Sequence, residues 1–512
     1  MLVKTYGSAC YGVKAITITI EVDVSPGFGF SMVGLPDSAV KESQQRISTA
    51  VQAIGLKMPG RKVVINMAPA DIRKEGSAYD LPLAIGILAA SGQLNAERLE
   101  QYVLMGELSL DGYLRPITGT LPIAIQARSE GFAGFILPKE NAREAAVVNN
   151  LDIYGMETLQ GVIDFFNDAK SFEPLTVNTR EEFASRTASY DVDFSDVKGQ
   201  ENVKRALEIA AAGAHNLIMI GPPGAGKTML AKRLPSILPP LSLQEALETT
   251  KIHSVAGKME KNTGLISCRP FRSPHHTISN VGLVGGGSNP QPGEISLAHN
   301  GVLFLDELPE FQRTVLEVMR QPLEDRQITV ARAKYSVDYP ANFMLVASMN
   351  PCPCGNYNHP DKKCLCPPGA VQKYLSRISG PLLDRIDIHI EIIPVPFAKL
   401  SEMQASESSE IVRQRVIRAR QIQEQRFAVA QGIYHNAMMP SRLLKKYCVL
   451  DNSCQQLLKQ AMERMGLSAR AYDRILKVAR TIADLAQQET ILPDHVAEAI
   501  QYRSLDREGW AG

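Results

Sequence analysis

One stretch of the chain, Gly221 to Thr228, fits the phosphate-binding pattern G-x-x-x-x-G-K-[ST] at every position. Residues 216–220 predict a buried strand before it, and residues 229–234 predict a helix after it. Glycines let backbone N–H groups turn toward a phosphate, and the helix N-terminus adds a positive dipole end. We therefore expect Lys227 to reach the β- and γ-phosphates of ATP and Thr228 to hold Mg²⁺. The expected nucleotide-binding set is Gly221, Pro222, Pro223, Gly224, Ala225, Gly226, Lys227, Thr228 and Met229.

A second nucleotide motif follows, where the apolar run 301–305 ends in Asp306 and Glu307. Asp306 is expected to hold Mg²⁺, directly or through water, and Glu307 to polarise the attacking water as a general base. An apolar strand ending in two acids is a weak signal alone, but it becomes strong after a phosphate-binding loop in an α/β pattern. Residues 343–350 predict another buried strand, which ends in the polar residue Asn350. Together these motifs predict an ATPase.

The composition narrows the class of protein. The chain has 512 residues, 45% of them hydrophobic and 21% charged, with a net charge of +1. This composition is typical of a globular protein, and the length suggests about three domains. A net charge so near zero gives no global signature of nucleic-acid binding, so DNA contacts would need a local basic patch, multiplied by oligomerisation. No long apolar run or signal peptide is apparent, and we expect a cytoplasmic protein without a membrane partner.

The pattern predicts an α/β chain in three parts. Residues 1–166 alternate strand and helix signals and form one α/β domain, and residues 167–192 are a polar linker without periodicity. Residues 193–395 carry the nucleotide motifs and are expected to form an αβα core. Residues 396–512 are expected to form a helical lid. Expected strands include 13–22, 63–67 and 102–108, and expected helices include 37–54, 81–91, 121–129, 201–212, 408–427, 453–465, 468–487 and 494–502.

Four of the eight cysteines lie close together, as two C-x-C pairs. The pairs Cys352/Cys354 and Cys364/Cys366 would supply four thiolates to a tetrahedral Zn²⁺, although the spacing departs from the usual C-x₂₋₄-C. Reduced free thiols and a redox disulfide are the alternatives, and His359 is a spare ligand candidate. The adjacent histidines 275 and 276 are expected to be loop residues without a metal, because no acid or cysteine nearby completes a ligand set.

The order of the motifs is similar to that of AAA+ ATPases, and the resemblance implies further roles. Asn350 would be sensor 1, which holds the attacking water or the γ-phosphate. Arg385, in Leu382–Ile388, matches the arginine finger that reaches the γ-phosphate of a neighbouring subunit, with a local salt bridge to Asp384 or Asp387 as the alternative. Arg470, at the start of a lid helix, would be sensor 2 facing the bound nucleotide, with Arg474 as the alternative.

Residues 327–339 predict two short strands around a basic tip, because apolar side chains alternate on both arms. Arg332 and Lys334 would lie at or near the turn. This tip is either simply solvated or a DNA contact. In AAA+ motors that include the MCM helicases, a hairpin at this place lines a central pore, and a six-membered ring would bring a dozen such charges to one channel.

The first domain resembles the proteolytic domain of Lon proteases, which use a Ser/Lys dyad. The serine of the Lon segment G-P-S-A-G falls here on Ala78, with Ser77 one place early, and the lysine position falls on Leu121. Neither member of the dyad is in place. We therefore expect a Lon-like fold without peptidase chemistry.

The whole motif set resembles the magnesium-chelatase-like AAA+ family, in its ComM/YifB branch of bacterial competence proteins. The most specific segments are residues 194–200, 288–294, 349–355 and 379–387. The resemblance implies a homohexameric ring that uses ATP and Mg²⁺ to translocate on single-stranded and branched DNA. Such a ring acts as a helicase or branch-migration factor in natural transformation and recombination, with recombination proteins as further partners. Two other functions stay open: a chelatase-type ATPase that remodels a protein partner, and an ATP-dependent protease.

Overall fold

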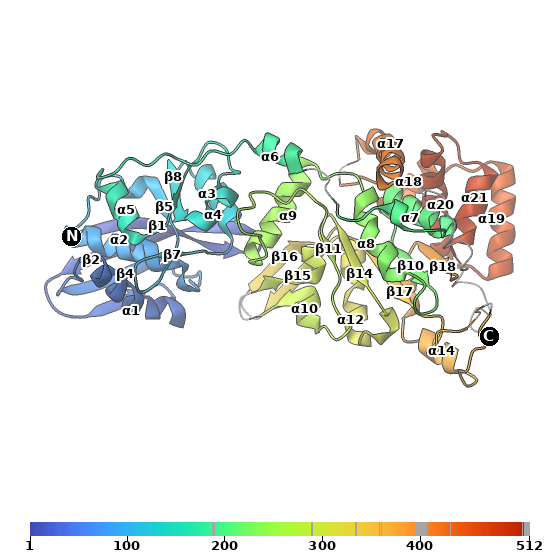
Figure 1. Cartoon of the computed structure of the whole chain (residues 1–512), viewed down its shortest axis with the longest axis horizontal. Coiled ribbons are helices and arrows are strands. Elements are labelled where there is room, and N and C mark those ends of the chain that lie inside the picture. Colours follow the sequence, from blue (N-terminus) through green and yellow to red (C-terminus); the bar gives the residue numbers. More distant parts are fainter. Residues whose placement is uncertain are drawn as a thin grey trace.

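A computed structural model covers the full chain and describes residues 1–186, 190–287, 290–332, 335–357, 359, 361–394, 407–430, 432–503 and 505. Figure 1 shows an elongated molecule with the N-terminal domain at one end, the nucleotide core in the middle and the helical lid at the other end. The mixed α/β class, with a parallel sheet in the core and a helical C-terminal part, is as predicted from the sequence.

The N-terminal domain is built on a seven-stranded sheet in the order β3-β4-β2-β1-β5-β8-β9. Its first two strands form a long antiparallel hairpin, joined at Gly12, whose φ of +62° is in the left-handed region that glycine tolerates. The strands are β1 (Leu2–Tyr11), β2 (Lys14–Ser25), β3 (Phe30–Val33), β4 (Lys62–Ala68), β5 (Tyr102–Leu104), β8 (Gly134–Pro138) and β9 (Asp152–Met156), with a small pair β6 (Glu107–Leu108) and β7 (Leu114–Arg115).

The helices of this domain are α1 (Ser38–Ala53), α2 (Asp80–Ala90), α3 (Thr120–Ser129), α4 (Lys139–Ala145) and α5 (Leu159–Phe166). Helix α1 begins as predicted, because the Asp37 carboxylate accepts a hydrogen bond from the backbone N–H of Val40. Every residue of α2 is buried, which explains its continuous apolar sequence. Two predictions were incomplete. Strand β1 was not predicted, and the strand expected at 102–108 is divided into β5 and β6.

The segment predicted as a linker is more structured than expected. It contains helix α6 (Thr179–Arg186), and the Leu175 N–H donates to the carbonyl of Ile153 in β9. The Thr179 hydroxyl donates to the carbonyl of Val147. Residues 175–179 of this segment therefore lie on the surface of the first domain.

The core is a five-stranded, all-parallel sheet in the order β11-β14-β17-β10-β18. Its strands are β10 (Leu217–Ile220), β11 (Phe271–Arg272), β14 (Val302–Leu305), β17 (Met344–Met349) and β18 (Ile388–Glu391). Its longer helices are α7 (Glu201–Gly213), α8 (Lys227–Ile237) and α9 (Leu243–Val255). The shorter elements are α10 (Asn280–Val284), β12 (Gly285–Gly286), β13 (Gln291–Pro292), α11 (Glu294–Leu297), α12 (Arg313–Val318), α13 (Arg320–Asp325), α14 (Ala370–Leu375) and α15 (Gly380–Leu383).

The predicted hairpin is present as β15 (Gln327–Arg332) and β16 (Tyr335–Pro340), paired from Gln327↔Pro340 to Arg332↔Tyr335. Its alternating apolar face is buried, and it reaches the first domain. The Tyr11 hydroxyl donates to the Ser336 carbonyl at 3.1 Å, and a Cβ added at Gly12 would lie 2.5 Å from a methyl of Val337. The β1–β2 turn is therefore packed directly on this hairpin.

The lid contains α17 (Ser409–Phe427), α18 (Ser441–Tyr447), α19 (Asn452–Met465), α20 (Ala469–Leu485) and α21 (Pro493–Gln501). Four of these helices are close to the predicted ranges, whereas the short α18 was not predicted. Helices α17 and α20 pack on α7, so lid and core share one hydrophobic core. The buried pair Arg426–Asp484 adds a charged cross-link within the lid.

Candidate nucleotide-binding site

The phosphate loop lies at the carboxyl end of β10, between that strand and α8. Gly224 and Gly226 have φ values of +79° and +86°, which require glycine. A Cβ at Gly221 would lie 2.7 Å from the carbonyl oxygen of Ile392, so this position also excludes a side chain. Lys227 begins α8, whose first N–H groups face the loop. The sequence therefore folds locally into an anion cradle.

The Lys227 ammonium group lies inside this cradle. Its Nζ donates to the carbonyl oxygens of Gly221 at 2.6 Å and Pro222 at 3.0 Å, and to Asn350 Oδ1 at 3.1 Å. Burial lowers the pKa of Lys227, and the charges of Asp306 and Glu307 oppose that shift. The predicted sensor residue Asn350 is therefore brought together with the predicted phosphate-binding lysine.

The predicted magnesium ligands also meet. The Thr228 hydroxyl donates to Asp306 Oδ2 at 2.6 Å, and the Ser348 hydroxyl donates to Asp306 Oδ1. A threonine hydroxyl and a carboxylate are the oxygen donors that Mg²⁺ takes in phosphate sites, so these residues fit the ion. Ser348 was missed by the sequence reasoning. Its signal was its place in β17, next to β14 in the sheet, which only the topology reveals.

Glu307 stands at the mouth of the site, with its side chain 55% exposed. Its backbone has a φ of +55°, a left-handed conformation that is uncommon outside glycine and turns the residue away from the strand. His276 Nδ1 lies 3.7 Å from Glu307 Oε2. The histidine pair was predicted to be loop residues without a metal, and no local pattern indicated that His276 adjoins the candidate base.

The three candidate arginines lie at the other edge of the sheet. Because the strands are parallel, the phosphate loop is at their carboxyl ends and Asp387, just before β18, is at their amino ends. Arg474 Nη1 lies 2.9 Å from Asp387 Oδ1, and Arg470 Nη1 lies 3.1 Å from Asp384 Oδ2. A four-residue strand separates the two edges by about 13 Å. The lid therefore does not bring Arg470 to the phosphate loop of its own chain.

Arg385 is held near the same edge. Its Nη1 donates to the carbonyl of Pro381 at 2.5 Å, and its Nη2 forms an ion pair with Glu324 of α13. Its side chain is 12% exposed. In the isolated chain the candidate arginine finger is thus folded back onto α13, and its partner is neither Asp384 nor Asp387.

Arg474 belongs to a buried charge network. Asp387 is 1% exposed and accepts hydrogen bonds from the Asn216 N–H at 3.1 Å and from the His215 ring at 3.3 Å. Burial alone would raise the pKa of Asp387, but the charge of Arg474 and the His215 contact outweigh it and hold this pKa well below its usual range. Arg474 therefore has a structural partner, whereas Arg470 is 68% exposed.

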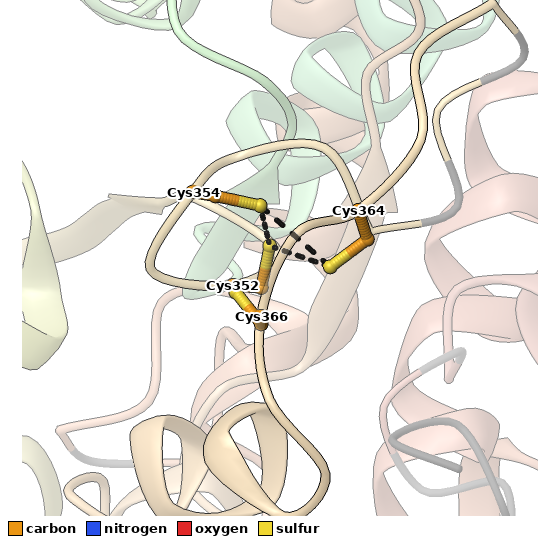
Figure 2. Close-up of side chains that lie close together, drawn as sticks. All are labelled: Cys352, Cys354, Cys364 and Cys366. Atoms are coloured by element: carbon orange, nitrogen blue, oxygen red, sulfur yellow. Dashed lines mark hydrogen bonds between the residues drawn. The ribbon is translucent and has the colours of Figure 1, made fainter.

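The four clustered cysteines converge in the loop after β17, as Figure 2 shows. Cys352 Sγ lies 3.4 Å from Cys354 Sγ and 3.8 Å from Cys364 Sγ, and the Cys354–Cys364 separation is 3.6 Å. All four sulfurs, including that of Cys366, lie within 4.8 Å of one another. Tetrahedral zinc with Zn–S bonds of about 2.3 Å requires sulfurs about 3.8 Å apart, so the donor set fits Zn²⁺.

The thiols of the cluster differ in acidity. Backbone N–H groups of Leu365 and Asn356 lower the pKa of Cys354 to about 6, whereas burial and neighbouring thiols raise the pKa values of Cys352 and Cys366. The spare candidate His359 is used elsewhere, since its Nδ1 accepts from the N–H groups of Asp361 at 3.0 Å and Lys362 at 3.1 Å.

The remaining predicted positions belong to the hairpin and to the segments that align with the Lon dyad. Arg332 is the last residue of β15, and Lys334 lies outside the described residues, as do residues 288 and 289. Ala78 lies in a short 3₁₀ turn, Ser77–Tyr79, where the Ser77 hydroxyl donates to Glu107. Leu121 is fully buried in α3. Ser77 is thus paired with an acid, not with the lysine that a peptidase dyad requires.

Nowhere in the described part of the chain does a helix combine the length and apolarity needed to cross a membrane. Three family models match the chain. Residues 193–400 match "Magnesium chelatase, subunit ChlI", residues 20–141 match "Subunit ChlI of Mg-chelatase", and residues 406–503 match "Magnesium chelatase, subunit ChlI C-terminal".

Relatives match along nearly the whole length. The chain is 44% identical to competence protein ComM of Haemophilus influenzae over 508 residues, which are 99% of this chain and 98% of the relative. It is 46% identical to the uncharacterized protein YifB of Salmonella typhimurium over 504 residues, 98% of this chain and 96% of the relative. Lon protease 2 of Bacillus subtilis is 33% identical over 157 residues, 28% of this chain and 27% of the protease.

These matches agree with the predicted fold class of a Lon-like part, a chelatase-type AAA+ core and a helical C-terminal part. An AAA+ core of this family indicates ATPase activity with ATP and Mg²⁺. The chain belongs to the magnesium-chelatase-like AAA+ family, in the branch that contains ComM and YifB.

Proposed function

We propose that this chain is the subunit of a homohexameric ATP-driven motor that translocates on DNA. The motor would act as a helicase or branch-migration factor while incoming single-stranded DNA is integrated in natural transformation and recombination. One observation carries the proposal: the phosphate loop and Glu307 lie at one edge of the core sheet, and Arg385 lies near the other. A head-to-tail ring would bring the two edges together at every interface.

Each residue then has a defined task at the shared site. Lys227 exchanges its carbonyl contacts for the β- and γ-phosphates, and Thr228 and Asp306 hold Mg²⁺, which when bound neutralises phosphate charge. Glu307 accepts the proton of the attacking water, and Asn350 orients that water. Arg385 leaves Glu324 and contacts the γ-phosphate of the neighbouring subunit, with Arg470 as a second cation across the interface.

The DNA contact is assigned to the hairpin β15–β16. Its inner face is fixed by burial of Ile328, Val330 and Val337, and its two strands pair as far as Arg332 and Tyr335. Arg332 and Lys334 would track phosphates in a sequence-independent way, and repetition around a ring compensates for the near-neutral net charge. The competence name of the Haemophilus influenzae relative supports DNA as the substrate.

The cysteine cluster is assigned a structural Zn²⁺. The four sulfurs come from one loop that is otherwise rich in proline and glycine, and four-coordinate thiolate sites of this kind order a loop and leave no open position for chemistry.

A chelatase-type remodelling ATPase is the second candidate, because the matching family models are those of a chelatase subunit. It predicts that a protein partner, not DNA, stimulates hydrolysis. A peptidase is disfavoured by Ala78, Leu121 and the Ser77–Glu107 contact.

The deciding experiment is displacement of a labelled strand from a three-strand DNA junction with ATP and Mg²⁺, together with ATPase rates with and without DNA. We expect displacement and DNA-stimulated hydrolysis by the wild type and neither by Glu307→Gln, because losing a general base lowers rates by about 10²–10⁴-fold. Replacing Arg332 and Lys334 by Ala should weaken DNA binding while basal hydrolysis persists. If the wild type shows neither displacement nor stimulation by DNA, the motor assignment fails.

A further inference from the structure

A second cavity, of about 540 Å³, lies between the core and the lid, at the amino ends of the core strands and so at the edge opposite the phosphate loop. Its core side is the connection between α8 and α9 and the segments that enter β14 and β17. Its lid side is α17 and residues 432–438. Small-molecule pockets typically occupy about 300–1,000 Å³, so this cavity is large enough for a ligand of nucleotide size.

Three arginines line this core–lid cavity, and two of them lack a carboxylate partner among the described residues. Arg269 is paired with Glu245 at 3.2 Å. By contrast, Arg326 donates to the Phe343 carbonyl at 3.1 Å, and Arg420 donates to the Ala211 carbonyl at 2.9 Å. Each guanidinium carries five N–H donors, so most of the donors of these two half-buried side chains are not used by these carbonyl contacts.

The acids of the cavity do not neutralise these two cations. Glu245 is engaged by Arg269, and Glu248 lies 3.5 Å from His299 Nε2. Glu424 is exposed at the rim, where water screens its charge. Burial lowers the pKa of Arg326, and it lowers the pKa of Arg420 to about 9, although the charge of Asp387 opposes the first shift and those of Glu245 and Glu424 oppose the second.

An unpartnered polar group completes the arrangement. His435 lines the cavity and is 6% exposed, and its Nδ1 has no hydrogen-bond partner in the described structure. Burial and the nearby charges of Arg420 and Arg326 lower the pKa of His435 well below its ordinary value, so the ring is neutral and can offer an N–H group to a ligand that enters the cavity. Phe343 and Tyr434 add apolar surface beside these donors.

We propose that the core–lid cavity binds a small phosphorylated anion of up to nucleotide size, held by Arg326 from the core and by Arg420 and His435 from the lid. Two guanidinium forks suit the several oxygens of a phosphate or pyrophosphate group. The site is distinct from the phosphate loop, and it does not depend on the proposed DNA motor. Because the residues that hold the anion belong to both the core and the lid, bound anion would stabilise the contact between these two parts.

Calorimetric titration of the full chain with inorganic pyrophosphate tests the site, using Lys227→Ala to silence the phosphate loop. We expect saturable binding to one site per chain, weakened about tenfold or more by Arg420→Met, since each charge-assisted contact contributes about 1.5–3 kcal/mol. Arg418→Met, an exposed position on the same helix, is the matched control and should bind as its parent does. Unchanged affinity in Arg420→Met, or no saturable binding in its parent, overturns the proposal.

A second measurement does not depend on the stability of the Arg420 variant. Hydrogen exchange of the Lys227→Ala chain, with and without pyrophosphate, should show added protection in residues 238–248 and 432–438. Titration with ADP as a second arm distinguishes a free phosphate group from a nucleotide. The small-anion site is rejected if hydrogen exchange is unchanged at both segments under saturating pyrophosphate. It is also rejected if the chain binds an oligonucleotide but not pyrophosphate.

Discussion

Gly355 of the cysteine-rich loop packs directly against Pro223 of the phosphate loop. A Cβ added at Gly355 would lie 2.5 Å from the Pro223 Cδ, and Gly355 has a φ of +79°. The two loops also share a cavity of about 40 Å³, lined by Pro222 and Tyr357 among others. The cysteine-rich loop therefore packs against one wall of the candidate nucleotide site.

The contact predicts that Gly355→Ala weakens ATP binding. The variant must displace Pro223, and the left-handed backbone adds about 1–2 kcal/mol of strain for any side chain. Gly369→Ala is a matched control, because its φ is +77° and a Cβ there meets nothing within 4 Å. Both variants should lose unfolding free energy through backbone strain, Gly355→Ala more because of its clash with Pro223. Only Gly355→Ala should lose nucleotide affinity, by about fivefold for each kcal/mol that reaches the loop. Equal ATP affinity in the two variants would show that the loops are not coupled.

The cysteine geometry predicts one Zn²⁺ per chain, measurable by metal analysis of protein purified under reducing conditions. Cys364→Ser should lose the metal, because it removes one of four ligands, and its melting temperature should fall since a structural zinc stabilises its loop. Cys268→Ser lies outside the cluster and should keep the full metal content. Metal-free wild-type protein would leave the cluster as free thiols or a redox pair.

Arg474 and Arg470, one helical turn apart, are predicted to differ in what they stabilise. Arg474→Ala removes the cation that pairs with the buried Asp387 carboxylate. The free energy of unfolding, measured with denaturant, should therefore fall by about 3–5 kcal/mol. Arg470→Ala removes an exposed pair and should change stability by less than about 1 kcal/mol. Similar losses of stability in the two variants would contradict this division of roles.

The same pair predicts a pH dependence. Because the folded pKa of Asp387 lies well below its unfolded value, its contribution is complete above about pH 5 and declines as pH falls through the unfolded pKa toward the folded one. Arg474→Ala should raise the folded pKa and so flatten this acid limb. An identical acid limb in wild type and variant, measured by unfolding between about pH 1 and pH 5, would show that Asp387 does not carry this pH dependence.

The sequence predicted which residues lie together at the phosphate loop, because each of them follows a recognisable buried strand. Lys227 and Thr228 follow one strand, Asp306 ends a second and Asn350 a third, and parallel strands bring such ends together. Ser348 and His276 were missed, because their contacts depend on strand order and on the path of a loop. The place of Arg470 depends on how the lid docks on the core. No local pattern encodes that docking.

The separation of Lys227 from Arg385 predicts complementation between two inactive chains. Lys227→Ala should not bind ATP productively, and Arg385→Ala should lose about 10³–10⁵-fold in hydrolysis, as expected for an arginine finger. In a mixed ring, about a quarter of the interfaces would join the intact phosphate loop of one variant to the intact Arg385 of the other, because the interface is head-to-tail. ATPase activity should therefore recover on mixing. Arg442→Ala, an exposed lid position, should be active alone. Activity of Arg385→Ala by itself, or no recovery in mixtures that assemble, would place Arg385 outside the shared site.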